Sequence, residues 1–177
     1  MSILAFNIMQ FFPSLNYQLF SLILVKAGFN HKVLNFFKNY LVSRKTSYLW
    51  NSFFSPFCNV DVCIRQRSAL SPILLALYFS LIFHILEKCL KNLKIPILIL
   101  SFIDDGLFIS QYKSISVSNV NLYCSYNVIS TLSTKFEFVI EYRKTEVFHF
   151  SRLYGVFNPP PLDLTPFGGS ILLLKTT

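Results

Sequence analysis

The spacing of apolar and polar residues in the first third of the chain predicts one strand followed by two helices. Residues 3–12 form an apolar, aromatic-rich run that ends at Pro13, which is typical of a buried strand. Residues 16–26 predict a short apolar helix that stops at Gly28. Asn30 can cap the next helix, whose apolar side chains fall on one face: Val33, Phe36, Phe37, Tyr40 and Leu41.

The middle of the chain predicts two strands and a long helix. Residues 46–50 form the first strand, and alternation in residues 58–64 predicts a second strand with one buried face. A polar and basic corner, residues 65–68, then leads into an apolar helix that begins near Pro72. Residues 69–86 fall slightly short of the roughly 20 apolar residues that a membrane-spanning helix needs. A helix buried on all sides and a membrane span therefore both remain open for this segment.

The last part predicts two hairpins around a fourth helix. The runs 97–102 and 107–110 flank Ile103, Asp104, Asp105 and Gly106, which predicts a hairpin with two acids at its tip. Residues 138–140 and 147–150 predict a second hairpin, and residues 155–177 predict a loop or tail. The helix between the hairpins has poor helix propensity, so packing must hold it. Its apolar positions are Leu122, Tyr126, Ile129, Leu132 and Phe136. The order of elements predicts an α+β fold, an antiparallel sheet with helices packed on one face.

Composition and the N-terminus add four constraints. A length of 177 residues favours a single domain, and 53% apolar residues with a mean hydropathy of +0.51 indicate either a large core or surfaces that meet other chains. The net charge of +8 favours nucleic acid or an anionic membrane surface as partner, although a basic surface kept for solubility explains it equally well. The four cysteines and three histidines show no zinc-ligand spacing, so buried free thiols in a reducing compartment are expected. The N-terminus lacks the basic start of a signal peptide, which predicts an intracellular protein, cytoplasmic or nuclear.

Asp104 and Asp105 are the candidates for chemistry. Adjacent carboxylates repel each other unless a cation lies nearby, and Mg²⁺ takes oxygen ligands of this kind. The alternative is a turn in which Asp-Gly simply suits the backbone, and the dipeptide alone favours this alternative.

Four segments in order resemble the conserved motifs of reverse transcriptases. FIDDG (102–106) resembles motif C, QRSALSP (66–72) resembles motif B, FNIMQFFPSLN (6–16) resembles motif A, and residues 138–150 resemble motif D. The stretches LSPILLALYFSLIFHILEK and KTEVFHFSR are most similar to non-LTR (LINE-type) retrotransposons of fungal genomes. The resemblance implies a partial polymerase palm over residues 1–154, with residues 155–177 leading toward a primer grip and thumb. Compared with that family, the sequence is interpreted as a truncated and degenerate copy of the reverse transcriptase domain.

The resemblance implies an RNA-directed DNA polymerase that uses two Mg²⁺ or Mn²⁺ ions for nucleotidyl transfer. Its partners would be an RNA template, a DNA primer and a deoxynucleoside triphosphate; no specific protein partner is inferred. Metal binding and catalysis are assigned to Asp104 and Asp105, and the matching position on the first strand is Asn7.

Two departures from the family predict a pseudoenzyme. The family has aspartate where this chain has Asn7, and a neutral amide does not supply the negative charge that a metal pair needs. The family has glycine where this chain has Arg67, directly after Gln66, and arginine adds bulk where substrate should approach. No other acid is expected to replace the missing carboxylate.

Further roles carried over are substrate-binding ones. Besides Gln66 and Arg67, Phe12 matches the aromatic residue under the sugar, and Lys144 matches a lysine near the triphosphate. The alternatives are a core phenylalanine and a solvated turn lysine. Arg44-Lys45 is interpreted either as a contact to the nucleic-acid backbone or as a charge pair at a helix C-terminus.

Two other functions stay open: a non-catalytic nucleic-acid-binding remnant with weak, salt-sensitive affinity, and a small membrane protein that spans at residues 69–86.

Overall fold

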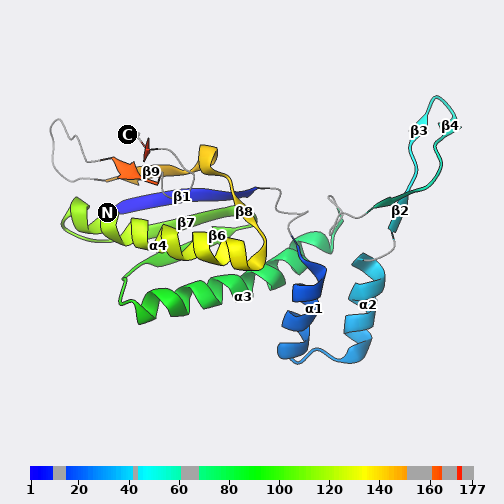
Figure 1. Ribbon diagram of the computed structural model, residues 1–177, viewed down its shortest axis with the longest axis horizontal. Coiled ribbons are helices and arrows are strands. Elements are labelled where there is room, and N and C mark those ends of the chain that lie inside the picture. Colours follow the sequence, from blue (N-terminus) through cyan, green and yellow to red (C-terminus); the bar gives the residue numbers. More distant parts are fainter. Residues whose placement is uncertain (10–14, 42–43, 61–67, 151–160, 165–170, 173–177) are drawn as a thin grey trace. The chain divides into compact units, whose positions relative to one another are not determined.

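The computed structural model describes residues 1–9, 15–41, 44–60, 68–150, 161–164 and 171–172 (Figure 1). Contacts divide the chain into two compact units, where its length led us to expect one domain. Unit 1 consists of Met1–Phe11 and Phe79–Thr177, and unit 2 is Phe12–Tyr78. Each unit is described by itself.

Unit 1 is built on a five-stranded antiparallel sheet. Strand β1 (Ser2–Met9) lies at its centre and pairs on one side with β7 (Asp105–Ser110), which in turn pairs with β6 (Leu98–Phe102). On its other side, β1 pairs with β8 (Val139–Ile140) and with β9 (Glu146–His149). The predicted α+β fold with an antiparallel sheet is confirmed.

Strands β8 and β9 do not form the second hairpin that the sequence predicted. Both pair with β1, end to end along the same edge, with the register Ile8↔Ile140 for β8 and Leu4↔Val147 for β9. A short 3-10 helix, η1 (Tyr142–Lys144), separates them. The eight residues of β1 offer enough unpaired backbone groups for two short partners, and backbone groups at a sheet edge need partners.

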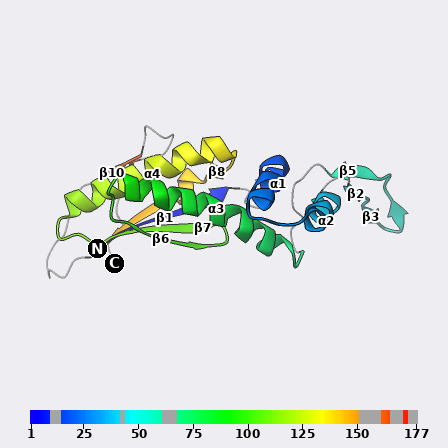
Figure 2. The same ribbon diagram turned by 90° about the horizontal axis from the view of Figure 1, so that it is seen from below.

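One face of this sheet is buried under helices. Along β1, Leu4, Phe6 and Ile8 are buried while the residues between them are half-exposed, which is the period of a strand with one covered face. Helix α4 (Ile115–Phe136) covers the buried face together with the unit-1 part of α3 (Ser71–Asn92), as Figure 2 shows. The predicted apolar stripe of α4 is buried as expected: Leu122, Tyr126, Ile129, Leu132 and Phe136. Packing thus holds a segment of poor helix propensity.

Helix α3 buries one stripe and is not buried on all sides. Within unit 1 its buried side chains are Phe79, Ile82, Leu86 and Leu90, which recur every three or four residues. In the described part of the chain, α3 is the one helix long and apolar enough to cross a membrane. The core helix of a water-soluble protein meets the same criterion, so this property decides nothing by itself.

Unit 2 begins with two helices, α1 (Tyr17–Lys26) and α2 (His31–Leu41), as the sequence predicted, and the predicted Asn30 cap of α2 is confirmed. The Asn16 side-chain oxygen accepts a hydrogen bond from the Leu19 amide at 3.0 Å. Asn30 does the same for Val33 at 3.1 Å, so each asparagine satisfies a free N–H of the first helical turn. Gly28 has φ +82, a left-handed conformation that lets the chain turn after α1.

A long hairpin follows in place of the two separate strands expected. Its base is the pair β2 (Arg44–Thr46) and β5 (Cys58–Val60), and its tip is the pair β3 (Leu49–Trp50) and β4 (Phe53–Phe54). Cys58 is exposed and the thiols at positions 89 and 124 are half-buried, so the expected burial of the cysteines is wrong for the described ones.

The segment expected as loop or tail, residues 155–177, contains a further short ladder. Strands β10 (Leu162–Asp163) and β11 (Ile171–Leu172) pair antiparallel there.

Candidate functional site

The two acids lie at the tip of the β6–β7 hairpin, as predicted. Phe102 pairs with Asp105, which leaves Ile103 and Asp104 as a two-residue loop. Ile103 has φ 54, in the left-handed region that β-branched residues rarely adopt. Such a conformation costs on the order of 1–3 kcal/mol and is found preferentially at functional sites.

Gly106, directly after the acids, is required by packing across the sheet. It is the cross-strand partner of Phe6, and a Cβ built on Gly106 would overlap the Phe6 ring. That ring lies between Gly106 and Phe108, whose ring centroid is 5.0 Å away. The sequence suggested a turn glycine, but the structure shows a glycine that makes room for an aromatic ring on β1.

Asn7 lies directly beside both carboxylates. It is the cross-strand partner of Asp105, and its Nδ2 donates hydrogen bonds to Oδ2 of Asp104 at 3.1 Å and to Oδ1 of Asp105 at 3.0 Å. Backbone bonds fix this arrangement, because the Ile8 amide donates to the Asp104 carbonyl and the Glu141 amide donates to the Asn7 carbonyl, each at 2.8 Å. The structure therefore brings Asn7, Asp104 and Asp105 together, as the motif order implied.

The Asn7 amide changes the electrostatics of the acid pair. Two hydrogen bonds from one NH₂ group offset part of the repulsion between the carboxylates, without adding a full charge. An aspartate at this position would instead add a third negative charge to the cluster. The arrangement therefore stabilises the hairpin tip through a neutral polar contact.

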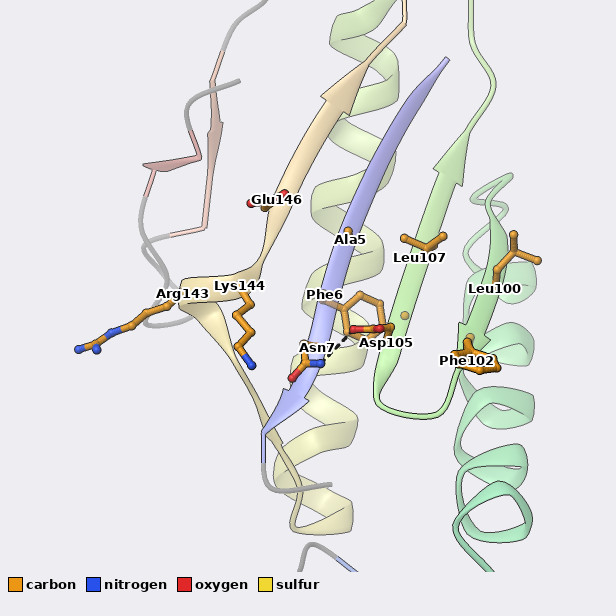
Figure 3. A pocket seen from close by; sticks show the side chains of 12 residues that line it. Ala5, Phe6, Asn7, Leu100, Phe102, Asp105, Leu107, Arg143, Lys144 and Glu146 are labelled. Carbon is orange, nitrogen blue, oxygen red and sulfur yellow. Dashed lines mark hydrogen bonds between the residues drawn. The ribbon is translucent and has the colours of Figure 1, made fainter. Parts of the chain in front are cut away.

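The site opens into a pocket of about 740 Å³ on the face of the sheet opposite the helices (Figure 3). Its floor is largely apolar, with Leu100, Phe102 and Leu107, and Asn7 and Asp105 lie at one end. Charged side chains from η1 and β9 line another side: Arg143, Lys144 and Glu146. The pocket thus combines an apolar surface with groups of both charges.

Lys144 lines this pocket, whereas the sequence analysis left two interpretations of it open. Figure 3 shows its side chain directed from η1 toward Asn7, while Arg143 points away. Sequence reasoning missed Arg143 and Glu146. A signal for Glu146 existed, because it directly precedes the predicted strand 147–150, and a residue that extends this strand by one position faces the opposite side from the buried Val147.

Three predicted site residues, Phe12, Gln66 and Arg67, lie outside the described residues, and their roles stay predictions. Arg44 and Lys45 lie on β2, shortly after α2 ends at Leu41, and both interpretations of this pair stay predictions.

The described residues do not fit a pair of metal ions. Within the described ranges, no group of three or more His, Cys, Asp and Glu side chains could hold a metal ion. Asp104 and Asp105 offer oxygen ligands, but the Asn7 NH₂ group donates to both, and Glu146 pairs with Ala5 farther along β1. The acid pair thus supplies carboxylates from one strand only, whereas a pair of metal ions requires carboxylates from two strands.

These features define the class of the fold as a polymerase-type palm: an antiparallel sheet, helices on one face, and adjacent acids at a hairpin tip on the other. Two solved telomerases have a similar fold. Apo telomerase from Candida tropicalis, truncated from its C-terminal domain, aligns with a TM-score of 0.53 and 16% identity over 89% of this chain. Telomerase from Candida albicans, in complex with the TWJ fragment of telomeric RNA, aligns with a TM-score of 0.51 and 13% identity over 92% of this chain.

The chain spans about a third of the length of these structures, 32% of one and 29% of the other. At such identities the likeness shows the fold alone, which is reverse-transcriptase-like. No protein-family model matches the chain. No curated protein matches it either.

Proposed function

We propose that this chain is a reverse-transcriptase palm derived from a non-LTR retrotransposon, and that it has lost most or all polymerase activity. The observation that carries the proposal is the position of Asn7, whose NH₂ group bridges Asp104 and Asp105. The motif order and the reverse-transcriptase-like fold support the ancestry. An intracellular location, cytoplasmic or nuclear, accompanies this proposal.

The loss of activity follows from the chemistry of the acid cluster. When bound, two divalent ions would activate the primer hydroxyl and stabilise the leaving group, and they need carboxylates from both strands. Here one strand supplies two acids and the other supplies an amide. Loss of an outer-shell partner already costs about 10–100-fold in metal affinity or activity, so the loss of a direct carboxylate ligand should cost more.

The charged side of the pocket supports residual binding of a phosphate-bearing ligand. Lys144 and Arg143 lie on η1, and both line the pocket. An ammonium group that faces the acid cluster can hold a phosphate as a point charge. The Glu146 carboxylate on the same side opposes this binding, so the affinity should be modest and strongly dependent on salt.

Primer extension tests the proposed loss of activity. The purified chain is incubated with a poly(rA)/oligo(dT) template, deoxythymidine triphosphate and Mg²⁺ or Mn²⁺, beside Asp104→Ala as the matched inactive control. Both proteins should incorporate no nucleotide above background, while circular dichroism shows that both are folded. Incorporation that disappears in Asp104→Ala would show that Asn7 is tolerated and that the proposal of inactivity is wrong.

Metal titration tests whether residue 7 lies at a metal-ligand position, because an aspartate there should increase the affinity for metal. The double variant Asn7→Asp with Arg67→Gly should bind Mg²⁺ or Mn²⁺ at least about 10-fold more tightly than the natural chain in calorimetry. Asn7→Ala with Arg67→Gly is the control, since it removes the amide without adding a charge. Equal metal affinity in all three proteins would contradict a metal-ligand position for residue 7.

A further inference from the structure

The hairpin of unit 2 exposes an unusual number of large apolar side chains. Six of them lie within ten residues, and each is 62–76% exposed: Tyr48, Leu49, Trp50, Phe53, Phe54 and Phe57. Water-soluble proteins rarely leave a continuous apolar patch of this kind uncovered unless it binds something. We call residues 44–57 the aromatic hairpin.

The aromatic hairpin has defined geometry. Asn51 and Ser52 form its two-residue loop with φ 44 and φ 69, and two left-handed residues in a row are the signature of a turn that matches the twist of paired strands. Below the tip, the Ser55 amide donates to the Tyr48 carbonyl at 2.9 Å, and the Tyr48 amide donates to the Ser55 hydroxyl at 2.8 Å. The exposed rings are therefore presented by ordered backbone.

Strand alternation sorts the side chains onto two faces. Trp50 pairs with Phe53, and Tyr48 lies two residues before Trp50, so these three aromatic residues share one face. Leu49 and Phe54 pair with each other and lie on the opposite face. One side of the hairpin thus carries three aromatic groups at the spacing of neighbouring strand positions.

The basic charge of the protein is concentrated in the same unit. Residues 12–78 contain seven of the 16 Lys+Arg but one of the eight Asp+Glu, so this unit carries +6 of the net charge of +8. No Asp or Glu occurs before Asp61. Arg44 and the exposed Lys45 lie on β2, directly before the aromatic hairpin's tip. A partner of this unit is therefore expected to be strongly anionic.

We infer that the aromatic hairpin binds single-stranded nucleic acid. Bases stack on the face formed by Tyr48, Trp50 and Phe53, and phosphates are attracted by Lys45 and the surplus positive charge of unit 2. Aromatic platforms next to basic side chains bind single strands in this way, because every base offers a flat π-face. A purely apolar protein partner would not account for the nearly acid-free sequence around the rings. The inference concerns unit 2 alone and does not depend on the acid cluster of unit 1.

Trp50 provides a direct readout because it is the only tryptophan in the chain. The full-length protein is titrated with a single-stranded oligo(dT) of about 12 nucleotides while tryptophan emission is recorded. Emission should be quenched to saturation, and binding should weaken at least about 10-fold between roughly 50 and 200 mM salt. An abasic oligomer of equal length and charge should bind much more weakly, because it offers phosphates without bases.

Matched variants separate stacking from general charge. Phe53→Ala should weaken oligo(dT) binding by about 5- to 100-fold, whereas Tyr112→Ala, which removes an exposed aromatic group of unit 1, should leave it unchanged. Lys45→Ala should reduce the salt dependence, with the exposed Lys113→Ala as its control. These are surface substitutions, and circular dichroism confirms that each variant is folded.

Several outcomes would overturn the inference. Equal affinity for oligo(dT) and for the abasic oligomer would show that binding is purely electrostatic. Equal effects of Phe53→Ala and Tyr112→Ala on oligo(dT) affinity would show that the aromatic hairpin is not the binding site. A blue shift of Trp50 emission with phosphatidylserine vesicles, without a response to oligo(dT), would assign the surface to a membrane. The inference rests on oligo(dT) binding by unit 2, and the proposed function rests on primer extension at the acid cluster of unit 1, so failure of one is distinguishable from failure of the other.

Discussion

Asn7 on β1 and Asp105 on β7 are cross-strand partners, and Nδ2 of Asn7 lies 3.0 Å from Oδ1 of Asp105 as a hydrogen-bond donor. The same nitrogen also donates to Asp104. A single amide thus offsets part of the repulsion between two adjacent carboxylates.

The first prediction concerns stability at position 7. Asn7→Asp removes both donated hydrogen bonds and adds a third negative charge, so the chain in EDTA should lose about 1–3 kcal/mol of unfolding free energy. Mn²⁺ should restore part of that loss, because a ligand that binds only the folded state stabilises it. Thermal unfolding with and without Mn²⁺ measures both effects. Asn7→Ala, the control, should also be less stable but should not respond to Mn²⁺; a similar response in both variants would contradict the explanation.

A second prediction tests the packing of Gly106. Gly106→Ala forces a Cβ into the Phe6 ring, which should destabilise the protein by about 1–3 kcal/mol in urea unfolding. In a Phe6→Leu background, Gly106→Ala should reduce the unfolding free energy much less, because the added Cβ then meets no aromatic ring. Strictly additive effects of the two substitutions would show that they do not interact and that the assigned contact is wrong.

A third prediction concerns backbone strain at Ile103. Because this residue has φ 54 and is 45% exposed, Ile103→Asn should stabilise the hairpin by about 1 kcal/mol, as asparagine tolerates the left-handed conformation. Leu98→Asn is the matched control on the same hairpin, since Leu98 is exposed but lies within β6. Urea unfolding should show a gain for the first variant and none for the second. A loss at Ile103 would mean that its apolar contacts outweigh the strain.

The fourth prediction is a loss of stability in mild acid. Burial lowers the pKa of His149 below its ordinary value, and the positive N-terminus lowers it further. The ring lies within the sheet, with Nδ1 2.6 Å from the Ser2 hydroxyl. A histidine whose pKa is lower in the folded state contributes its full share of stability above the unfolded value of about 6.5, and that share falls as the pH drops below it. Urea unfolding from about pH 7.5 to about pH 5 should show this decline.

The control for His149 is a variant that cannot titrate there. His149→Gln should flatten the pH dependence in that window, whereas His31→Gln, at an exposed helix position, should keep the decline of the natural chain. If the His149→Gln protein declines as steeply, other groups govern the acid response.

Local pattern alone was sufficient for much of this fold. The Asn30 cap, the buried stripe of α4 and the hairpin that carries Asp104 all follow from spacing within a few residues, and the structure confirms them. Such features depend on helix and strand periodicity and on backbone groups that neighbours in the sequence satisfy. The resemblance in motif order added the expectation that Asn7 lies opposite the acids.

Tertiary structure decided what periodicity does not encode. Residues 138–150 contain two strand patterns, and only the length of β1 shows that both pair with it instead of with each other. The two hydrogen bonds from Asn7 join residues 97 and 98 positions apart, and Glu146 reaches the pocket through its pairing with Ala5. Contacts between residues so far apart in the sequence depend on which strands pair with each other. That pairing is determined by the packing of the whole sheet against its helices.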